Sequence, residues 1–244
     1  KDTLSLRVSK KNMAIDYSEL MKEFKISEMI DLSRGLARHP FKVYKQRKLS
    51  RIKRIVVHTT DWGASAKTIA EYDIKPNHIS ETGCPAITYH ELIGISGNPY
   101  KTLGYEEISW HAGMWNAGSV AIALAYRCSN KKGEDVYKPK RKLMTALHVR
   151  CGEMCLDFGL TPDRVVGHRE LKNTGWFIFK GSKKLRKTCP GINVDLELMR
   201  KNIARYMQIV LGTNGFYTEA VDGIFGPKSK EALTSYRISE SNYV

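Results

Sequence analysis

The stretch from Val165 to Gly191, VVGHRELKNTGWFIFKGSKKLRKTCPG, is the part of the chain around which the rest is interpreted. It contains His168 directly after a short apolar run, and it ends in Lys-Thr-Cys-Pro-Gly. Because Pro190 disfavours the helical region for the residue before it, we expect Cys189 to be extended. In an extended segment Lys187 and Cys189, two positions apart, point to the same face. A thiol, a fixed positive charge and a nearby imidazole would then share one space, as in a metal-activated hydrolytic site.

Length and composition favour a globular fold. At 244 residues the chain is long enough for one domain of ordinary size and a smaller appendage. Hydrophobic residues make up 42% of it, which excludes a disordered polar chain. No apolar run approaches the roughly 20 residues of a membrane span, and the N-terminus lacks the apolar core of a signal peptide. We therefore expect no integral membrane segment.

Charge and cysteine content limit the classes of binding partner and of cellular compartment that we expect. The chain has 40 Lys and Arg against 25 Asp and Glu, a formal net charge of +15. Such a balance indicates a polyanionic partner: nucleic acid, anionic lipid or an acidic cell-wall polymer. The five cysteines have no regular spacing, which argues against a disulfide framework and for a reducing compartment. At least one thiol is therefore available to bind a metal.

Hydrophobic periodicity predicts alternating strands and helices. Strands are expected at 55–57, 84–95 and 120–126, the first of them leading directly to His58. The clearest helix covers 140–159, where apolar residues repeat every three or four positions, and another amphipathic helix covers 194–211. Alternation of this kind indicates an α/β layered fold.

Three residues from distant parts of the chain are candidates for one metal site. A catalytic zinc takes three protein ligands and leaves a fourth position for water. His58 ends a predicted strand, His168 follows Gly167, which adds no side-chain bulk beside it, and Cys189 supplies a thiolate. A second metal site at His148, Cys151 and Cys155 has tempting spacing. These residues lie on the apolar side of the clearest helix, however, where cysteine is usually a small buried hydrophobe.

Five short motifs occur in the order found in one enzyme family. They are IVVHTT at 55–60, ITYHELIG at 87–94, WHAGMWN at 110–116, VGHREL at 166–171 and KTCPG at 187–191. In this order the chain resembles the zinc-dependent N-acetylmuramoyl-L-alanine amidases, which include phage lysozyme-type amidases and peptidoglycan recognition proteins. The resemblance covers roughly residues 41–200. It implies an α/β fold with a central mixed β-sheet flanked by helices, and a small helical C-terminal segment.

The resemblance also implies an activity and a set of site residues. The activity is hydrolysis, by zinc-activated water, of the amide bond between N-acetylmuramic acid and L-alanine of bacterial peptidoglycan. The implied residues are the Zn²⁺ ligands His58, His168 and Cys189, the catalytic residues Tyr89 and Lys187, and the substrate-groove residues His111 and Asn116. The lysine role belongs to the phage branch of the family. Tyr89 is expected to orient the attacking water or accept its proton, and Lys187 to stabilise the oxyanion.

The remaining parts of the chain complete a three-part division. Residues 1–40 are expected to form an N-terminal helical arm, 41–200 the zinc amidase domain, and 201–244 a short helical module. In that module DGIFGP at 222–227 resembles the turn of three-helix peptidoglycan-binding modules. The alternative is that this sequence only forms a turn and starts a helix, with no binding role. The long segment at 173–186 carries three aromatic residues and could be a lid over the substrate or a hydrophobic hook into the core.

These expectations favour a monomeric phage endolysin that accumulates in the host bacterial cytoplasm and acts on the cell wall at lysis. A bacterial autolysin or recycling amidase shares the same chemistry. A peptidoglycan-binding protein without activity is the alternative from another class, but Cys189, Tyr89 and Lys187 together favour catalysis. Nucleic-acid binding is supported by charge alone, and no recognised module accompanies that charge, so we predict no nucleic-acid partner.

Overall fold

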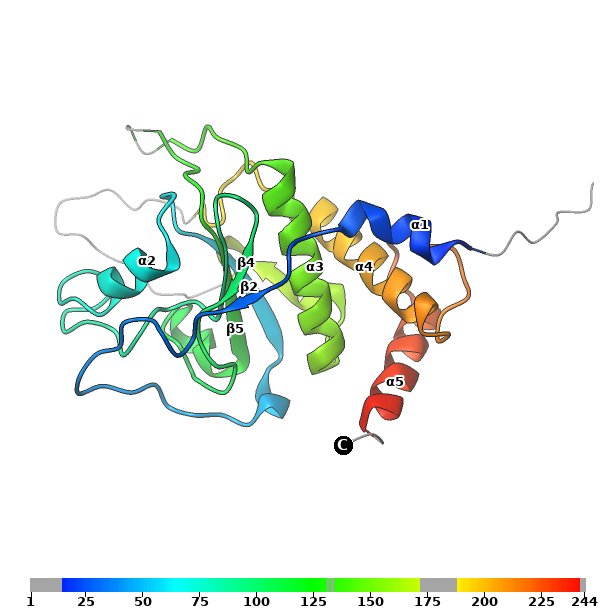
Figure 1. Ribbon diagram of the computed structural model, residues 1–244, viewed down its shortest axis with the longest axis horizontal. Helices are drawn as coiled ribbons and strands as arrows, with labels where there is room; N and C mark the ends of the chain where they lie inside the picture. Colours follow the sequence, from blue (N-terminus) through cyan, green and yellow to red (C-terminus); the bar gives the residue numbers. More distant parts are fainter. Residues whose placement is uncertain (1–14, 131, 133, 172–187, 242–244) are drawn as a thin grey trace, which may run out of the picture.

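The computed structural model describes residues 15–130, 132, 134–171 and 188–241. At its centre lies a six-stranded sheet with the order β1-β4-β3-β5-β2-β6 (Figure 1). The strands are β1 (Ile30–Asp31), β2 (Arg54–Thr59), β3 (Glu91–Ile93), β4 (Pro99–Lys101), β5 (Ser119–Leu124) and β6 (Val165–Gly167). β3 and β4 are antiparallel, and the other four neighbouring pairs are parallel. The sheet is therefore mixed, as the resemblance implied.

Helices cover both faces of this sheet. The helices are α1 (Tyr17–Met21), α2 (Ala66–Asp73), α3 (Arg141–Phe158), α4 (Leu196–Thr213) and α5 (Pro227–Ser241). Along β5, Ile122 and Leu124 join the core under α3, whereas Ala123 belongs to the core under α2. With both faces covered, β2 and β5 read as continuous apolar runs, as parallel strands usually do. Within the described residues, no helix is both long and apolar enough to cross a membrane.

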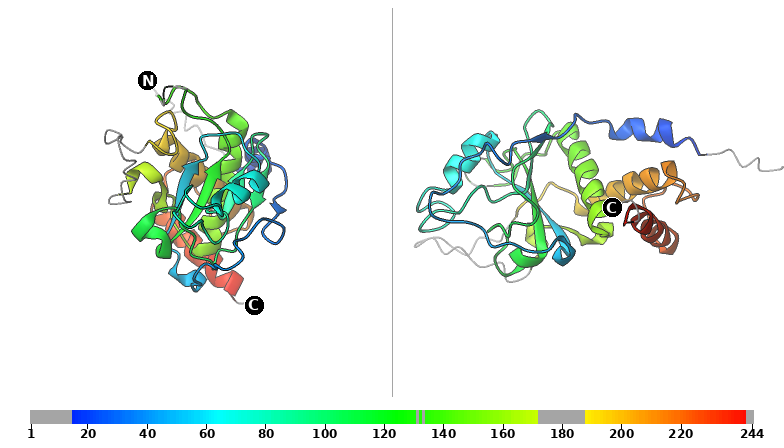
Figure 2. Two further views of the ribbon diagram at one scale, coloured as in Figure 1. Left: turned by 90° about the vertical axis from the view of Figure 1, so that its left-hand side faces the viewer. Right: turned by 60° about the horizontal axis from the view of Figure 1, so that its bottom comes forward.

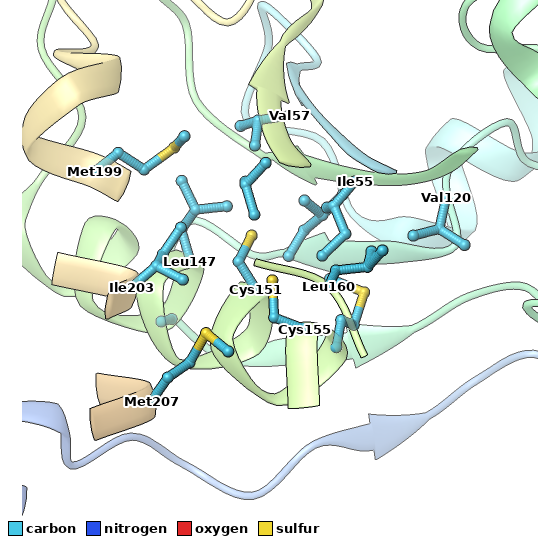
Figure 3. Packing of buried hydrophobic residues seen from close by; sticks show 14 of the residues in the cluster. Ile55, Val57, Val120, Leu147, Cys151, Cys155, Leu160, Met199, Ile203 and Met207 are labelled. Atoms are coloured by element: carbon cyan, nitrogen blue, oxygen red, sulfur yellow. The ribbon is translucent and has the colours of Figure 1, made fainter. Parts of the chain in front are cut away.

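The long central helix matches its prediction closely. α3 covers Arg141–Phe158 and ends at Gly159, whose φ of 65° gives the left-handed conformation that glycine adopts without cost. Its side chains Leu147, Cys151 and Cys155 pack between the sheet and α4 (Figure 3). The layers thus run from α2 through the sheet to α3 and then to α4 (Figure 1).

The predicted strand over 84–95 is far shorter in the structure, where β3 covers only Glu91–Ile93. Before β3, side chains take part in several of the backbone hydrogen bonds, although the His90 N–H still donates to the Ala121 carbonyl of β5 at 2.9 Å. The Asp73 carboxylate accepts hydrogen bonds from the backbone N–H and the hydroxyl of Thr88. The ring Nδ1 of His90 accepts the backbone N–H of Ala121, at 2.9 Å. Tyr89 therefore lies on an irregular segment and not on a strand.

The N-terminal part contains less helix than predicted. The helical spacing of Leu20, Phe24 and Ile30 suggested one helix, but α1 ends at Met21, a short 3₁₀ turn follows, and Lys25 is extended. The chain then reaches the sheet edge as β1, which pairs with β4. α1 itself lies along α4 (Figures 1 and 2), where the Tyr17 hydroxyl donates to the carbonyl of Tyr217 at 2.7 Å.

The C-terminal segment is helical, as implied, and is continuous with the rest of the molecule. α4 runs through the predicted boundary at residue 200, and residues of both α4 and α5 belong to the core that also contains α3. The fully buried side chain of Gln208 organises the DGIFGP turn. Its Nε2 donates to the Asp222 carboxylate and the Ile224 carbonyl, and its Oε1 accepts the N–H of Gly223.

Candidate metal centre

Two parallel strands bring the predicted histidines together. His58 is the second-to-last residue of β2, and His168 directly follows β6. Val57 is paired with Gly167, so the residues after each of them lie side by side at one edge of the sheet. The two imidazole ring centroids are 4.6 Å apart. Gly167 is required here because a Cβ would lie 2.8 Å from Leu196 and 3.1 Å from Pro190.

Cys189 completes the group. One nitrogen of each histidine and the Cys189 sulfur all lie within 4.8 Å of one another. The sulfur is 3.7 Å from Nδ1 of His58, whose side chain is only 3% exposed. Cys189 lies in a turn in which the Gly191 N–H bonds to the Thr188 carbonyl at 2.7 Å, and the expected extended conformation of Cys189 itself stays a prediction. The predicted alignment of Lys187 with Cys189 lies outside the described residues.

A chain of hydrogen bonds sets the orientation of His58. Its Nε2 is 3.0 Å from Nδ1 of His111, and Nε2 of His111 is 3.2 Å from the Ser119 hydroxyl. That hydroxyl donates to the Trp115 carbonyl at 2.6 Å, so it accepts from His111. His111 then carries its proton on Nε2 and accepts one from His58. The lone pair of His58 is consequently on Nδ1, the nitrogen that faces Cys189.

His111 is neutral in this arrangement. Burial, with smaller electrostatic effects of His90, His168 and Arg47, lowers the pKa of His111 well below 6.5. Its side chain is only 8% exposed. The structure thus places His111 behind a ligand of the candidate metal centre, a role that the motif alone did not suggest. Its predicted contact with substrate stays a prediction.

Asn116 supports the same segment. Its Oδ1 accepts the backbone N–H groups of His111 and Ala112, at 3.1 and 2.7 Å. Its carbonyl accepts a hydrogen bond from the guanidinium of Arg47. The side chain therefore holds the loop that carries His111, and its role in substrate binding also stays a prediction. Sequence reasoning missed Ser119, because a serine at a strand start carries no signal of its own.

Tyr89 lies next to the candidate metal centre. Its ring centroid is 5.4 Å from that of His58, and its side chain is partly buried. Burial, with a smaller effect of Cys189, raises the pKa of Tyr89. A phenol at this position has the reach to hydrogen-bond a reacting group beside the ligands, and its catalytic role stays a prediction. Lys187 and the 173–186 segment lie outside the described residues.

The alternative metal site on α3 is not formed. Cys151 and Cys155 are fully buried in the core, and His148 is 7% exposed. Among the described residues, His58, His168 and Cys189 form the only group of three or more His, Cys, Asp or Glu residues close enough to share a metal. None of the five cysteines, all of which lie among the described residues, is in a disulfide.

Comparison with known families identifies the class of protein. The sequence model for N-acetylmuramoyl-L-alanine amidase matches residues 48–192, more than half of the chain. The chain therefore belongs to the N-acetylmuramoyl-L-alanine amidase family. The matched range contains all three residues of the candidate metal centre. A search among curated proteins found no match.

Solved structures with similar folds include recognition proteins and amidases. Drosophila PGRP-LB has a TM-score of 0.51 and 19% identity, with 71% of this chain and 93% of that chain covered. Drosophila peptidoglycan recognition protein SD also has a TM-score of 0.51, with 17% identity and coverage of 72% and 94%. The amidase LysC from Clostridium intestinale has a TM-score of 0.48 and 16% identity, covering 72% and 96%. At these identities the similarity to the two recognition proteins shows the fold alone.

Proposed function

We propose that this protein hydrolyses the amide bond between N-acetylmuramic acid and L-alanine in bacterial peptidoglycan, with zinc bound by His58, His168 and Cys189. The observation that carries the proposal is the convergence of two imidazoles and one thiol within the range matched by the amidase family. The net charge of +15 supports an anionic cell-wall polymer as the partner.

The three residues fit zinc in chemistry and spacing. Imidazole and thiolate are ligands that zinc prefers, and three of them leave a fourth tetrahedral position open, as in catalytic sites. Zn–N bonds of about 2.0 Å and Zn–S bonds of about 2.3 Å put such atoms about 3.5 Å apart at a tetrahedral angle. The 3.7 Å between His58 Nδ1 and the Cys189 sulfur agrees with that spacing.

Each residue then has a separate task. Zinc, when bound, supplies a Lewis acid that lowers the pKa of water to about 7 and polarises a carbonyl. His111 and Ser119 keep the Nδ1 lone pair of His58 directed to the metal position. The Tyr89 hydroxyl orients the attacking water by a hydrogen bond, and Lys187 stabilises the developing oxyanion, as the family resemblance implies.

Substitution of the thiol tests the proposal. Cys189→Ser should lose zinc and activity together, because zinc binds a thiolate far better than a hydroxyl. Zinc content is measured by elemental mass spectrometry, and cleavage by mass spectrometry of products from purified sacculi, which reports the broken bond. Cys128→Ser is the matched control, since its thiol donates to the Asp61 carboxylate and a hydroxyl can replace it. Zinc retained by Cys189→Ser at wild-type affinity would remove Cys189 from the ligand set.

Binding of peptidoglycan without cleavage is the second candidate. The observation that favours it is the fold similarity to recognition proteins, one of which, PGRP-LB, has been solved as a variant in complex with tracheal cytotoxin. Retention on sacculi with no released product from the zinc-loaded protein would establish this alternative. For the active enzyme, we propose an endolysin that is present in the host cytoplasm before lysis. Fractionation of infected cells before and after lysis tests that location.

A further inference from the structure

The backbone turn that carries Cys189 is held by side chains from two other segments. We infer that Arg169 and Tyr126 are positioning residues that place the Cys189 thiol for metal binding before any metal arrives. The inference rests on the proposed function, because it concerns the same three ligands. It assigns a role to two residues that lie outside the ligand set.

Arg169 donates hydrogen bonds to four backbone carbonyl groups in and beside the turn, including that of Thr188 at 3.4 Å. Its own backbone N–H donates to the Cys189 carbonyl at 2.8 Å. Its guanidinium donates to the Gly191 carbonyl and, at 2.7 Å, to the Val194 carbonyl. Arg169 directly follows His168, so one short segment both presents a ligand and holds the backbone of the next. Within the described residues, the hydrogen bonds of its guanidinium go to backbone carbonyl oxygens.

Tyr126, which lies just after β5, holds the turn by a second contact. Its side chain is 7% exposed, and its hydroxyl donates to the Pro190 carbonyl at 2.7 Å. The Tyr126 backbone is itself fixed to β2, since the Thr59 hydroxyl donates to its carbonyl at 2.9 Å. The backbone N–H of Thr59 also points to the Cys189 sulfur, at 3.3 Å. The strand that carries His58 is thus connected to the turn that carries Cys189.

The turn has little room to shift. Gly191 has a φ of 108°, and a Cβ there would lie 2.6 Å from the Tyr126 hydroxyl and 2.9 Å from Cβ of Cys128. On the far side of the turn, the Asp135 carboxylate accepts the N–H of Ile192 at 3.0 Å. The backbone on both sides of Cys189 is therefore held by protein contacts. A preformed ligand binds a metal more tightly because no ordering cost remains.

The test compares zinc affinity in variants that leave all three ligands in place. Tyr126→Phe removes one hydroxyl and Arg169→Met removes the guanidinium. Tyr217→Phe and Arg237→Met are matched controls, since Tyr217 donates to the Ala220 carbonyl and Arg237 to the Leu156 carbonyl at the end of α3, and neither carbonyl belongs to the turn that carries Cys189. Zinc dissociation constants come from competition with a chelating dye. Cobalt, used in place of zinc, reports thiolate bonding through its sulfur-to-metal absorption.

We expect zinc to bind about tenfold more weakly in Tyr126→Phe and Arg169→Met, in line with other residues that support metal ligands. The cobalt–thiolate absorption should also weaken, with Arg169→Lys restoring part of it. Circular dichroism checks that each variant folds. If Arg169→Met does not fold, the zinc affinity and cobalt spectrum of Tyr126→Phe test the inference. If the folded variants keep wild-type zinc affinity and wild-type cobalt spectra, the inference about Tyr126 and Arg169 is overturned, and the proposed function is not affected. Absence of zinc binding in the wild-type protein would overturn the proposed function as well.

Discussion

The backbone N–H of Thr59 points to the sulfur of Cys189 across 3.3 Å, although 130 positions separate the two residues in the chain. Hydrogen bonds to sulfur favour its charged form, which is the form that binds metal. Thr59 directly follows His58, so the same end of β2 supplies one ligand and orients another. The candidate metal centre is therefore organised around the carboxyl end of this strand.

Replacing Tyr89 by phenylalanine should separate catalysis from metal binding. The phenylalanine ring keeps the contact with His58, whose ring centroid is 5.4 Å away, while the hydroxyl is lost. Zinc content and thermal stability should stay unchanged, and turnover should fall by roughly 10²–10⁴, the usual contribution of a positioned proton-transfer group. Steady-state cleavage of a soluble muropeptide measures this. Unchanged turnover would exclude Tyr89 from the mechanism.

Gly191→Ala should weaken both folding and zinc binding. The new methyl group would lie 2.6 Å from the Tyr126 hydroxyl, and the residue would keep a left-handed φ. We expect a loss of about 1–3 kcal/mol in the free energy of unfolding, measured by urea titration. Gly215→Ala is the control, because its φ is +79° but no atom lies within 4 Å of a Cβ there. Equal effects on zinc affinity in the two variants would contradict the role of the turn.

The buried carboxylate of Asp73 should make stability depend on pH. Burial raises the pKa of Asp73 to about 6, although Thr88 donates two hydrogen bonds to it. The folded protein therefore holds this proton more tightly than the unfolded chain, and stability falls as pH rises from about 4 through 6. Asp73→Asn keeps an acceptor for Thr88 and cannot ionise. Its stability relative to wild type should rise by about 1–3 kcal/mol between pH 4 and pH 7.

Urea unfolding at pH 4.5 and pH 7 measures this change. Asp163→Asn, with a side chain 68% exposed, controls for the altered net charge. If the free energies of unfolding of wild type and Asp73→Asn differ by the same amount at pH 4.5 and pH 7, ionisation of the Asp73 carboxyl does not destabilise the folded protein, and the prediction is wrong.

Wall attachment by the C-terminal segment is testable at Ile224, which is 69% exposed in the DGIFGP turn. Ile224→Ser should reduce retention on purified sacculi several-fold and leave cleavage of a soluble muropeptide unchanged, if the turn contacts the wall. Ile238→Ser on α5, at 58% exposed, is the control. Retention unchanged in a cosedimentation assay would make the turn structural. Deletion of residues 212–244 is less informative, because it removes Tyr217, Ala232 and Leu233 from the core.

The two histidines of the candidate metal centre could be predicted from the sequence because local signals mark them, whereas the set of three with Cys189 rested on the family resemblance. A histidine ending an apolar run predicts a residue at the end of a buried strand, and parallel strands end at the same edge of a sheet. The support for those ligands could not be predicted in this way. The contact between His58 and His111 depends on the fold, and neither the motif around His111 nor the position of Ser119 reveals it.

Two segments depart from their predicted secondary structure for physical reasons. Apolar residues at 84–90 suggested a strand, but side chains of Asp73 and His90 take backbone partners that a strand would use. Apolar spacing between Leu20 and Ile30 suggested a helix, yet the segment is split between a short helix and a sheet edge. In both places tertiary contacts override the local pattern.

Because α4 continues through residue 200, that position is a poor place to join this protein to a foreign C-terminal segment. A chimera that receives a foreign C-terminal segment at that position would have a fusion joint inside a helix, with Met199 and Ile203 on either side of it in the shared core. A donor segment would have to continue the helix and supply matching apolar side chains against α3. Exchange of C-terminal sequence between relatives is therefore better attempted beyond α4, for example at the turn at 222–227, than at residue 200.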